Sequence, residues 1–243
     1  MSIKRKLQRS STALTKRHEP PVLIVRPHNP ENLTCQQTDI FIDKAVIRGI
    51  AECKMYASKV PELARNSAIQ AFLLGHTKKT HIFFLDDDST PENDYAIEVL
   101  MRHKKPVICA PTPICRYDPD NKHFNFLWNT IVTKDGHTEE KPQLENIGPD
   151  ELPKKLFKCH RTGGTGLLVH RDVLEKLQSP YQMTTYNDNW TDVTKSEDIY
   201  FCDKIRKAGF DIWADGNTVC HHYHRLDILD MFVVYEAALR DTP

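Results

Sequence analysis

Residues 80–88, THIFFLDDD, decide the fold of this chain. Ile82 to Leu85 are continuously apolar, which is typical of a strand that is covered on both faces. The strand ends abruptly in three carboxylates, Asp86, Asp87 and Asp88. Because ligands in open α/β sheets bind outside the carboxyl ends of the strands, this stretch predicts a binding site at one edge of a sheet.

Apolar runs and amphipathic segments alternate on both sides of this strand. Residues 21–26, PVLIVR, predict an earlier strand, and residues 106–110 predict a later one. Helices are predicted over residues 60–75, where apolar residues recur at helical spacing, and over residues 93–101. The order of strand, helix, strand, helix and strand favours the α/β class, with a mainly parallel central sheet flanked by helices.

The second half of the chain mixes loops with further elements. Residues 111–156 are rich in Pro, Asp, Asn, Lys and Glu, and we expect loops and hairpins there, forming a small antiparallel part. Helices are predicted at 171–177, from Ser196 to Gly209, and at 228–239, where an amphipathic helix closes the chain. Further strands are expected at 167–169, 211–214 and 218–224.

Charge balance excludes a protein whose whole surface attracts nucleic acid or an anionic bilayer. The 243 residues contain 33 Lys and Arg and 33 Asp and Glu, so the formal net charge is zero. Basic residues gather before Glu19, either as a solvated tail or as an arm that contacts a polyanion. We expect a basic flexible tail at residues 1–19 and a single domain at residues 20–243.

The apolar stretches and the cysteines indicate the cellular compartment to expect. No apolar stretch approaches the roughly 20 residues that span a bilayer, and the start lacks the apolar middle of a secretory signal. We therefore expect no integral membrane contact and a cytoplasmic location. The seven cysteines are scattered without a CxxC pair, which argues against a disulfide framework and predicts mostly buried thiols.

The aspartate triplet is the strongest candidate for chemistry. Clustered negative charge at a strand end is costly unless a hard cation neutralises it, and Mg²⁺ or Mn²⁺ prefers carboxylate oxygen together with ligand phosphate. Asp86 and Asp88 are separated by one residue, so both can lie on one side of an extended turn while Asp87 points elsewhere. The alternatives are a solvated acidic turn and a cap for the helix that begins near Pro91.

Five sequence pieces occur in an order that resembles one enzyme family. They are LARNSAIQAFL at 63–73, HIFFLDDDSTP at 81–91, RTGGTGLLVHRDVLEKL at 161–177, SEDIYFCDKIRKAGFDIWAD at 196–215 and VCHHYH at 219–224. Together they resemble nucleotide-sugar-dependent glycosyltransferases of the GT-A fold, close to the family-2-like enzymes. The resemblance spans roughly residues 20–225 and implies a single Rossmann-like GT-A domain.

The resemblance implies a donor site built around Mn²⁺ or Mg²⁺. In such enzymes the DxD carboxylates bind the cation, which bridges the diphosphate of the donor, here expected to be a UDP-sugar. By this resemblance Asp88 is the main metal ligand, and Asp86 faces the metal or the nucleotide ribose. The final histidine of the fold commonly completes the site, and His222 is the preferred candidate over His221 and His224.

A different metal site is the alternative for these histidines. Cys220, the neighbouring histidines and the pair Cys159-His160 could form a tetrahedral zinc site, although their spacing is irregular. Any of the histidines could also be an ordinary core or surface residue.

The resemblance also implies contacts with the donor and the acceptor. By this resemblance the end of the first strand contacts the base and ribose of the donor. The helix at 60–75 contacts the nucleotide or its phosphates. The glycine segment, residues 163–166, lines the donor sugar and the acceptor. The expected binding set is Arg26, Pro27, Arg65, Asp86, Asp87, Gly163, Gly164 and Thr165. A tight turn that needs positive φ is the alternative for the glycines.

The pair Glu197-Asp198 resembles the acidic motif of the family, in which an aspartate acts as base on an acceptor hydroxyl. Asp198 is the candidate base, with Glu197 beside it, and in-line attack would invert the anomeric configuration. Burial near a second carboxylate would raise the pKa of Asp198, whereas a helix N-terminus would lower it. A simple helix-capping acid pair is the alternative.

These inferences lead to one expected function and two alternatives. We expect a metal-dependent glycosyltransferase that acts on a carbohydrate, a glycan or a modified nucleic acid. A nucleotidyltransferase would need a glycine-rich loop after the first strand, and residues 27–30, PHNP, contain no glycine. A non-catalytic protein that binds sugar nucleotides or nucleic acid on the same fold is the other alternative.

Overall fold

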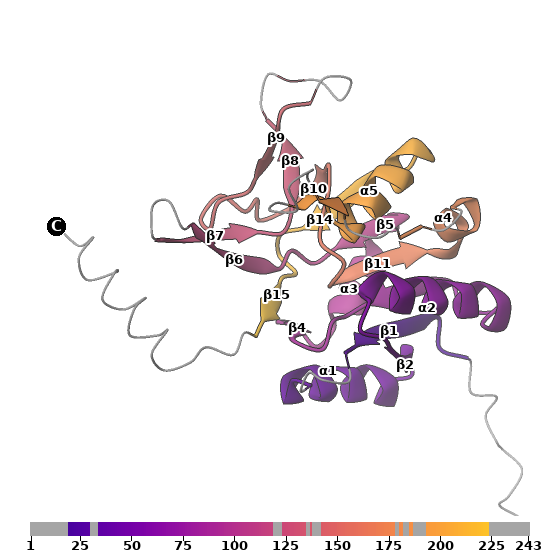
Figure 1. Cartoon of the computed structure of the whole chain (residues 1–243). Helices are drawn as coiled ribbons and strands as arrows, with labels where there is room; N and C mark the ends of the chain where they lie inside the picture. The colour runs from indigo at the N-terminus through magenta and orange to yellow at the C-terminus, as the bar shows by residue number, and fades with distance from the viewer. Residues whose placement is uncertain are drawn as a thin grey trace, which may run out of the picture.

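A seven-stranded sheet forms the centre of the molecule (Figure 1). The computed structural model describes residues 19–29, 34–118, 123–134, 137, 142–177, 180–181, 185–186 and 193–223. In order across the sheet the strands are β10 (Leu156–Cys159), β14 (Ile212–Asp215), β5 (Val107–Cys109), β11 (Leu167–His170), β3 (His81–Phe84), β1 (Val22–His28) and β2 (Ala51–Ala57). β10 and β11 run antiparallel to the rest, so the sheet is mainly parallel.

Helices cover both faces of this sheet. They are α1 (Gln36–Ile47), α2 (Pro61–Gly75), α3 (Ala96–Arg102), α4 (Arg171–Lys176) and α5 (Glu197–Lys207). Alternate residues of β1 face opposite ways, as strand geometry requires. Leu23 packs in one core cluster with residues of α2, α4 and α5, whereas Ile24 packs in a second cluster with residues of α1 and α3.

Short antiparallel pairs stand beside the central sheet (Figure 1). They are β4 (Ser89–Pro91) with β15 (Cys220–His222), β6 (Pro113–Asp118) with β7 (His123–Trp128), β8 (Ile131–Thr133) with β9 (Leu144–Asn146), and β12 (Thr185–Tyr186) with β13 (Val193–Lys195). The hairpins β6–β7 and β8–β9 confirm the antiparallel part expected over residues 111–156. The α/β class with a mainly parallel sheet is also confirmed.

The predicted element order is incomplete, because β4, β10 and the pair β12–β13 were not predicted as strands. The strands and helices expected from the strongest apolar runs are present within a few residues of their predicted bounds. Between β1 and α2, however, the chain adds α1 and β2, which the sequence pattern did not predict. The tail before Glu19 and the closing helix expected at 228–239 lie outside the described residues.

Within the described part of the chain, no helix combines the length and the apolar character needed to cross a membrane.

Candidate functional site

The three aspartates after β3 send their carboxylates to three different partners. Asp86 accepts two hydrogen bonds from Nη2 of Arg65, at 3.1 and 3.3 Å. Asp87 is bound by the guanidinium of Arg26 and, through its other oxygen, lies 2.6 Å from Nδ1 of His28. Asp88 faces His222. The triplet is therefore paired with cationic or imidazole side chains, while the Asp88 side chain is still 48% exposed.

Strand pairing brings His222 to Asp88. β15 runs antiparallel to β4, and His222 pairs with Ser89, the residue after Asp88. Nδ1 of His222 lies 3.0 Å from the carbonyl oxygen of Pro113, so it can donate its proton there and direct Nε2 toward Asp88, 3.5 Å away. A backbone carbonyl that orients the far nitrogen in this way is typical of metal-binding histidines.

Arg65 connects the triplet to the acidic pair at the start of α5. Its side chain is only 4% exposed. Nη1 donates to Glu197 at 2.8 Å and to Asp198 at 3.2 Å, while Nη2 donates to Asp86. One buried cation thus holds three carboxylates, and the acidic pair contacts Arg65 in addition to lying in the first turn of a helix.

Burial and this excess of negative charge set the protonation of the carboxylates. Burial raises the pKa of Asp198 to about 7; the charges of Glu197 and Asp86 act in the same direction, and Arg65 opposes them. Burial likewise raises the pKa of Asp86. For Asp88, burial is outweighed by hydrogen bonds with His222 and Ser89, which lower its pKa. A base whose pKa lies near neutrality is well suited to proton transfer.

The glycine segment passes close to the polar centre. A β-carbon on Gly163 would lie 2.6 Å from Nδ2 of Asn129, and one on Gly164 would lie 2.6 Å from Oδ1 of Asp198. Thr165 accepts a hydrogen bond from the backbone N–H of Asp86 at 3.1 Å. Of the three glycines in this segment, only Gly166 has a positive φ, of 69°, which accounts for a glycine at that position. Close approach therefore accounts for the first two glycines.

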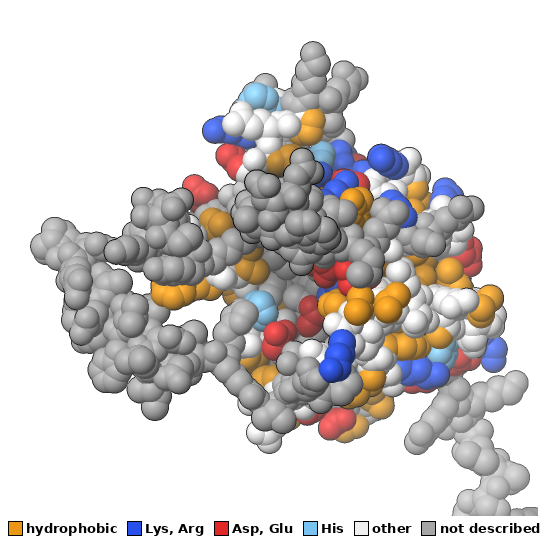
Figure 2. All heavy atoms as spheres, viewed as in Figure 1, with side chains coloured by type: hydrophobic (Ala, Val, Ile, Leu, Met, Phe, Trp, Pro, Cys, Tyr) orange, Lys and Arg blue, Asp and Glu red, His pale blue; other side chains and the backbone are white. Residues whose placement is uncertain are grey.

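Two cavities meet at this centre, and both are lined by Asp86, Asp198 and His222. The first, with a volume of about 340 Å³, continues past the end of β1 and the start of α2; its other lining residues are Pro27, His28, Asn29, Ser58, Lys59, Pro61, Arg65, Asp87, Asp88 and Glu197. Figure 2 shows acidic side chains and a histidine around a hollow on this face of the molecule. We call this space the β1 cavity.

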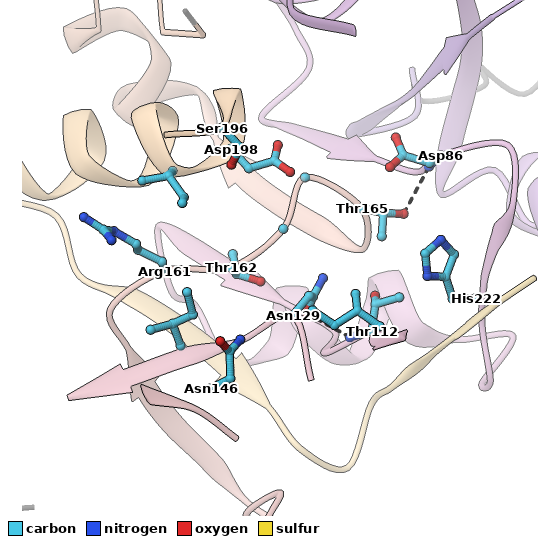
Figure 3. A pocket seen from close by; sticks show the side chains of 15 residues that line it. Asp86, Thr112, Asn129, Asn146, Arg161, Thr162, Thr165, Ser196, Asp198 and His222 are labelled. Carbon is cyan, nitrogen blue, oxygen red and sulfur yellow. Dashed lines mark hydrogen bonds between the residues drawn. The ribbon is translucent and has the colours of Figure 1, made fainter. Parts of the chain in front are cut away.

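The second space, which we call the hairpin cavity, has a volume of about 230 Å³. Its lining combines the glycine segment with Ser196 and Ile199 at the start of α5 and with residues in or beside the hairpins and the β10–β11 link: Thr112, Ile114, Asn129, Ile131, Asn146, Arg161 and Thr162. Figure 3 shows Asp86, Thr165 and His222 on one side of this cavity and Asn146 and Arg161 on the opposite side. The amide of Asn146 and the guanidinium of Arg161 therefore lie across the space from Asp86.

One of the expected contacts takes a different place. Arg26 is 4% exposed and its guanidinium binds Asp39 and Asp87, so among the described residues it belongs to an ion-pair network and to neither cavity lining. His28, two residues later, lines the β1 cavity in its stead. Asn129 and Asn146 line the hairpin cavity without belonging to any of the sequence motifs. Their positions depend on hairpin pairing, which only the composition of residues 111–156 indicates.

No cluster of three or more His, Cys, Asp or Glu residues in the described ranges is arranged to hold a metal ion. Cys159 and Cys220 belong to different core clusters, which argues against a zinc site that contains both thiols. Asp88 and His222 nevertheless fit a divalent cation that takes further oxygen ligands from a bound diphosphate and water, as magnesium sites usually do. His224 lies outside the described residues.

Comparisons with known proteins identify structures with a similar fold but do not identify a family. No protein-family model matches the sequence, and no curated protein matches it. The crystal structure of GalNAc-T7 with UDP, GalNAc and Mn²⁺ is similar with a TM-score of 0.51 at 11% identity, over 85% of this chain and 43% of that chain. The crystal structure of A197 from STIV has a TM-score of 0.49 at 14% identity, over 84% of this chain and 86% of that chain.

The similarity to GalNAc-T7 shows the fold alone, because the sequences are only 11% identical. This chain corresponds to less than half of the GalNAc-T7 chain. The chain therefore has a GT-A-like fold, as the sequence motifs implied.

Proposed function

We propose that this protein is a metal-dependent glycosyltransferase that moves a sugar from a nucleotide-diphosphate sugar to an acceptor hydroxyl. The observation that carries this proposal is the meeting of two cavities at Asp86, Asp198 and His222. Group transfer between two substrates requires two binding spaces that share one reaction centre. Here that centre contains a cation-binding pair and a base with a pKa near neutrality.

The β1 cavity is the proposed donor site. It lies at the carboxyl ends of β1 and β3, where open α/β sheets bind their ligands. His28 and Asn29 offer polar contacts for a nucleotide, and Lys59 offers a positive charge for its phosphates. The fold shared with GalNAc-T7, whose structure contains UDP, GalNAc and Mn²⁺, supports a UDP-sugar as the donor.

Asp88 and His222 are the residues proposed to hold Mn²⁺ or Mg²⁺. Carboxylate oxygen and imidazole nitrogen both suit manganese, and carboxylate oxygen also suits magnesium. A bound divalent cation would act as a Lewis acid on the departing diphosphate. Asp86 faces the same centre, but its carboxylate already accepts hydrogen bonds from Arg65. We therefore place Asp86 next to the donor and assign the main protein ligands to the other two residues.

The hairpin cavity is the proposed acceptor site, and Asp198 is the proposed base. Asp198 lines both cavities, so its carboxylate can reach an acceptor hydroxyl beside the donor sugar. It would take the hydroxyl proton while the acceptor oxygen attacks the anomeric carbon in line, which inverts the configuration. The side chains of Thr112, Asn129 and Asn146 suit the hydroxyl groups of a carbohydrate acceptor. Arg161 lines the same cavity, but its guanidinium is already paired with Asp203, so the lining favours a carbohydrate over the phosphates of a nucleic acid.

A panel of nucleotide sugars tests this function. The protein is incubated with each donor and Mn²⁺, with and without EDTA, and release of the nucleoside diphosphate is measured. Turnover is expected with at least one donor and is lost with EDTA and in Asp88→Ala. The matched control is Asp94→Ala, because Asp94 is a half-exposed aspartate that pairs with Lys44 away from the site. Turnover that is indifferent to EDTA and to Asp88→Ala would rule out the metal-dependent mechanism.

A further inference from the structure

Arg65 sits at the junction of three separate parts of the chain. It lies one turn into α2, and its guanidinium reaches Asp86 after β3 as well as Glu197 and Asp198 in α5. Both terminal nitrogens therefore already have carboxylate partners. An arginine engaged in this way is poorly placed to act as a phosphate clamp.

We propose that Arg65 is a positioning residue that holds the base Asp198 at a fixed place relative to Asp86. This proposal rests on the proposed function, because it assigns Asp198 the role of base. Three partly buried carboxylates repel one another unless a cation lies between them. A guanidinium is a planar fork of donors that can bind several carboxylate oxygens at once, which the single ammonium of a lysine cannot do with the same geometry.

An aromatic stack holds Arg65 itself. Its guanidinium carbon lies 5.5 Å from the ring centroid of Tyr181, which stacks on Phe201 with the ring centroids 4.3 Å apart. Asn66, the next residue of α2, fixes the backbone of Tyr181 by hydrogen bonds at both its N–H and its carbonyl, at 3.1 and 3.0 Å. Phe201 belongs to α5, so one stack joins the helix of the arginine to the helix of the base.

This arrangement predicts that loss of Arg65 lowers the turnover rate without weakening the binding of the donor. If Arg65 positions the base, its loss lets Asp198 move, and a misplacement of about 1 Å can cost about 100-fold in rate. The donor would still bind, because Arg65 donates its hydrogen bonds to Asp86, Glu197 and Asp198, whereas the proposed cation ligands Asp88 and His222 face each other. A phosphate-binding role predicts the opposite, namely weaker donor binding with a smaller effect on kcat.

The experiment compares Arg65→Ala and Arg65→Lys with the unchanged protein, with Arg48→Ala as a control that breaks a part-buried pair with Glu98 elsewhere. Thermal melts establish folding, calorimetry gives the Kd for UDP with Mn²⁺, and kcat is measured at saturating donor. We expect kcat to fall about 100-fold in both Arg65 variants while Kd changes less than about threefold. Guanidinium ion should restore part of the rate in Arg65→Ala but not in Asp198→Asn.

Two results of these assays would overturn the proposal. One is a Kd for UDP that rises tenfold or more while kcat stays near that of the unchanged protein; the other is full activity in Arg65→Lys. A crystal structure of Arg65→Lys provides a readout that does not depend on turnover. In it the Asp198 carboxylate should have left its present place beside Gly164, and an unmoved carboxylate would contradict the proposal. Absence of turnover in the unchanged protein would instead count against the proposed function.

Discussion

Gly164 lies directly against the carboxylate of Asp198: a β-carbon at this glycine would come within 2.6 Å of Oδ1 and within 2.7 Å of the Arg65 guanidinium. Real β-carbons essentially never approach other heavy atoms so closely. The missing side chain therefore allows the arginine and the base to meet beneath the glycine segment.

Gly164→Ala should abolish most of the activity. The added methyl group must displace Asp198 or Arg65, and we expect kcat to fall by about 100-fold because the base is misplaced. The control is Gly75→Ala at the end of α2, where a β-carbon meets nothing within 4 Å. Steady-state assays and a thermal melt of both variants make the comparison. Equal activities in the two variants would show that the contact with Gly164 does not matter for turnover.

Asp198→Asn should remove proton abstraction while preserving the shape of the site. General base catalysis contributes about 10²- to 10⁴-fold, so kcat should fall within that range. The affinity for UDP should stay within a factor of about two, because the cation ligands are unchanged. The measurement is kcat at saturating donor together with calorimetric Kd. A rate close to that of the unchanged protein would place the base on another residue.

The rate should depend on pH through the carboxylate of Asp198. Because its pKa is about 7, the base loses activity as pH falls below 7 and stays ionised above it. We expect log kcat/KM, which reports the ionising groups of the free enzyme, to fall with a slope near one on the acid side. Glu197→Gln removes a neighbouring negative charge that raises the pKa of Asp198, so it should move this limb to lower pH. The assay should run from about pH 5 to about pH 8, which is about two units below and one unit above the pKa of Asp198. A flat profile over this range would contradict the assignment of Asp198 as the base.

Arg26→Met should destabilise the fold without weakening nucleotide binding selectively. Arg26 is buried between Asp39 and Asp87, and breaking a buried ion pair costs about 3–5 kcal/mol of unfolding free energy. Lys44→Met is the control, since Lys44 and Asp94 are both about half exposed and such pairs contribute about 0–1 kcal/mol. Urea unfolding gives both values. A stable Arg26→Met protein that binds UDP weakly would instead support the contact between Arg26 and the nucleotide that the sequence predicts.

The sequence predicts the elements that are apolar on one face or on both. β3 and β1 are continuous apolar runs, and they were predicted close to their true bounds. In contrast, α1 buries Phe41 and Ala45 but exposes Ile47 and Val46, so apolar residues on two sides of the helix obscure its period. Its first residue also lacks a side-chain cap. These features explain why α1 was not predicted.

Residues next to strand ends could be predicted as site residues, but their partners could not. Asp88 follows a recognisable strand, whereas its proximity to His222 depends on pairing between β4 and β15 across more than a hundred residues. Arg65 could be placed on a helix, yet nothing in its local sequence indicates that it binds two carboxylates of α5. Long-range pairing of this kind leaves no local pattern in the chain.

The central claim is that a divalent cation held by Asp88 and His222 binds the diphosphate of the donor. Its most direct test is isothermal titration of UDP into the unchanged protein and into Asp88→Asn, each with Mn²⁺ and with EDTA. We predict that the unchanged protein binds UDP at least about tenfold more tightly with Mn²⁺ than with EDTA, and that Asp88→Asn loses this difference. Equal affinity for UDP with Mn²⁺ and with EDTA in the unchanged protein would contradict the claim.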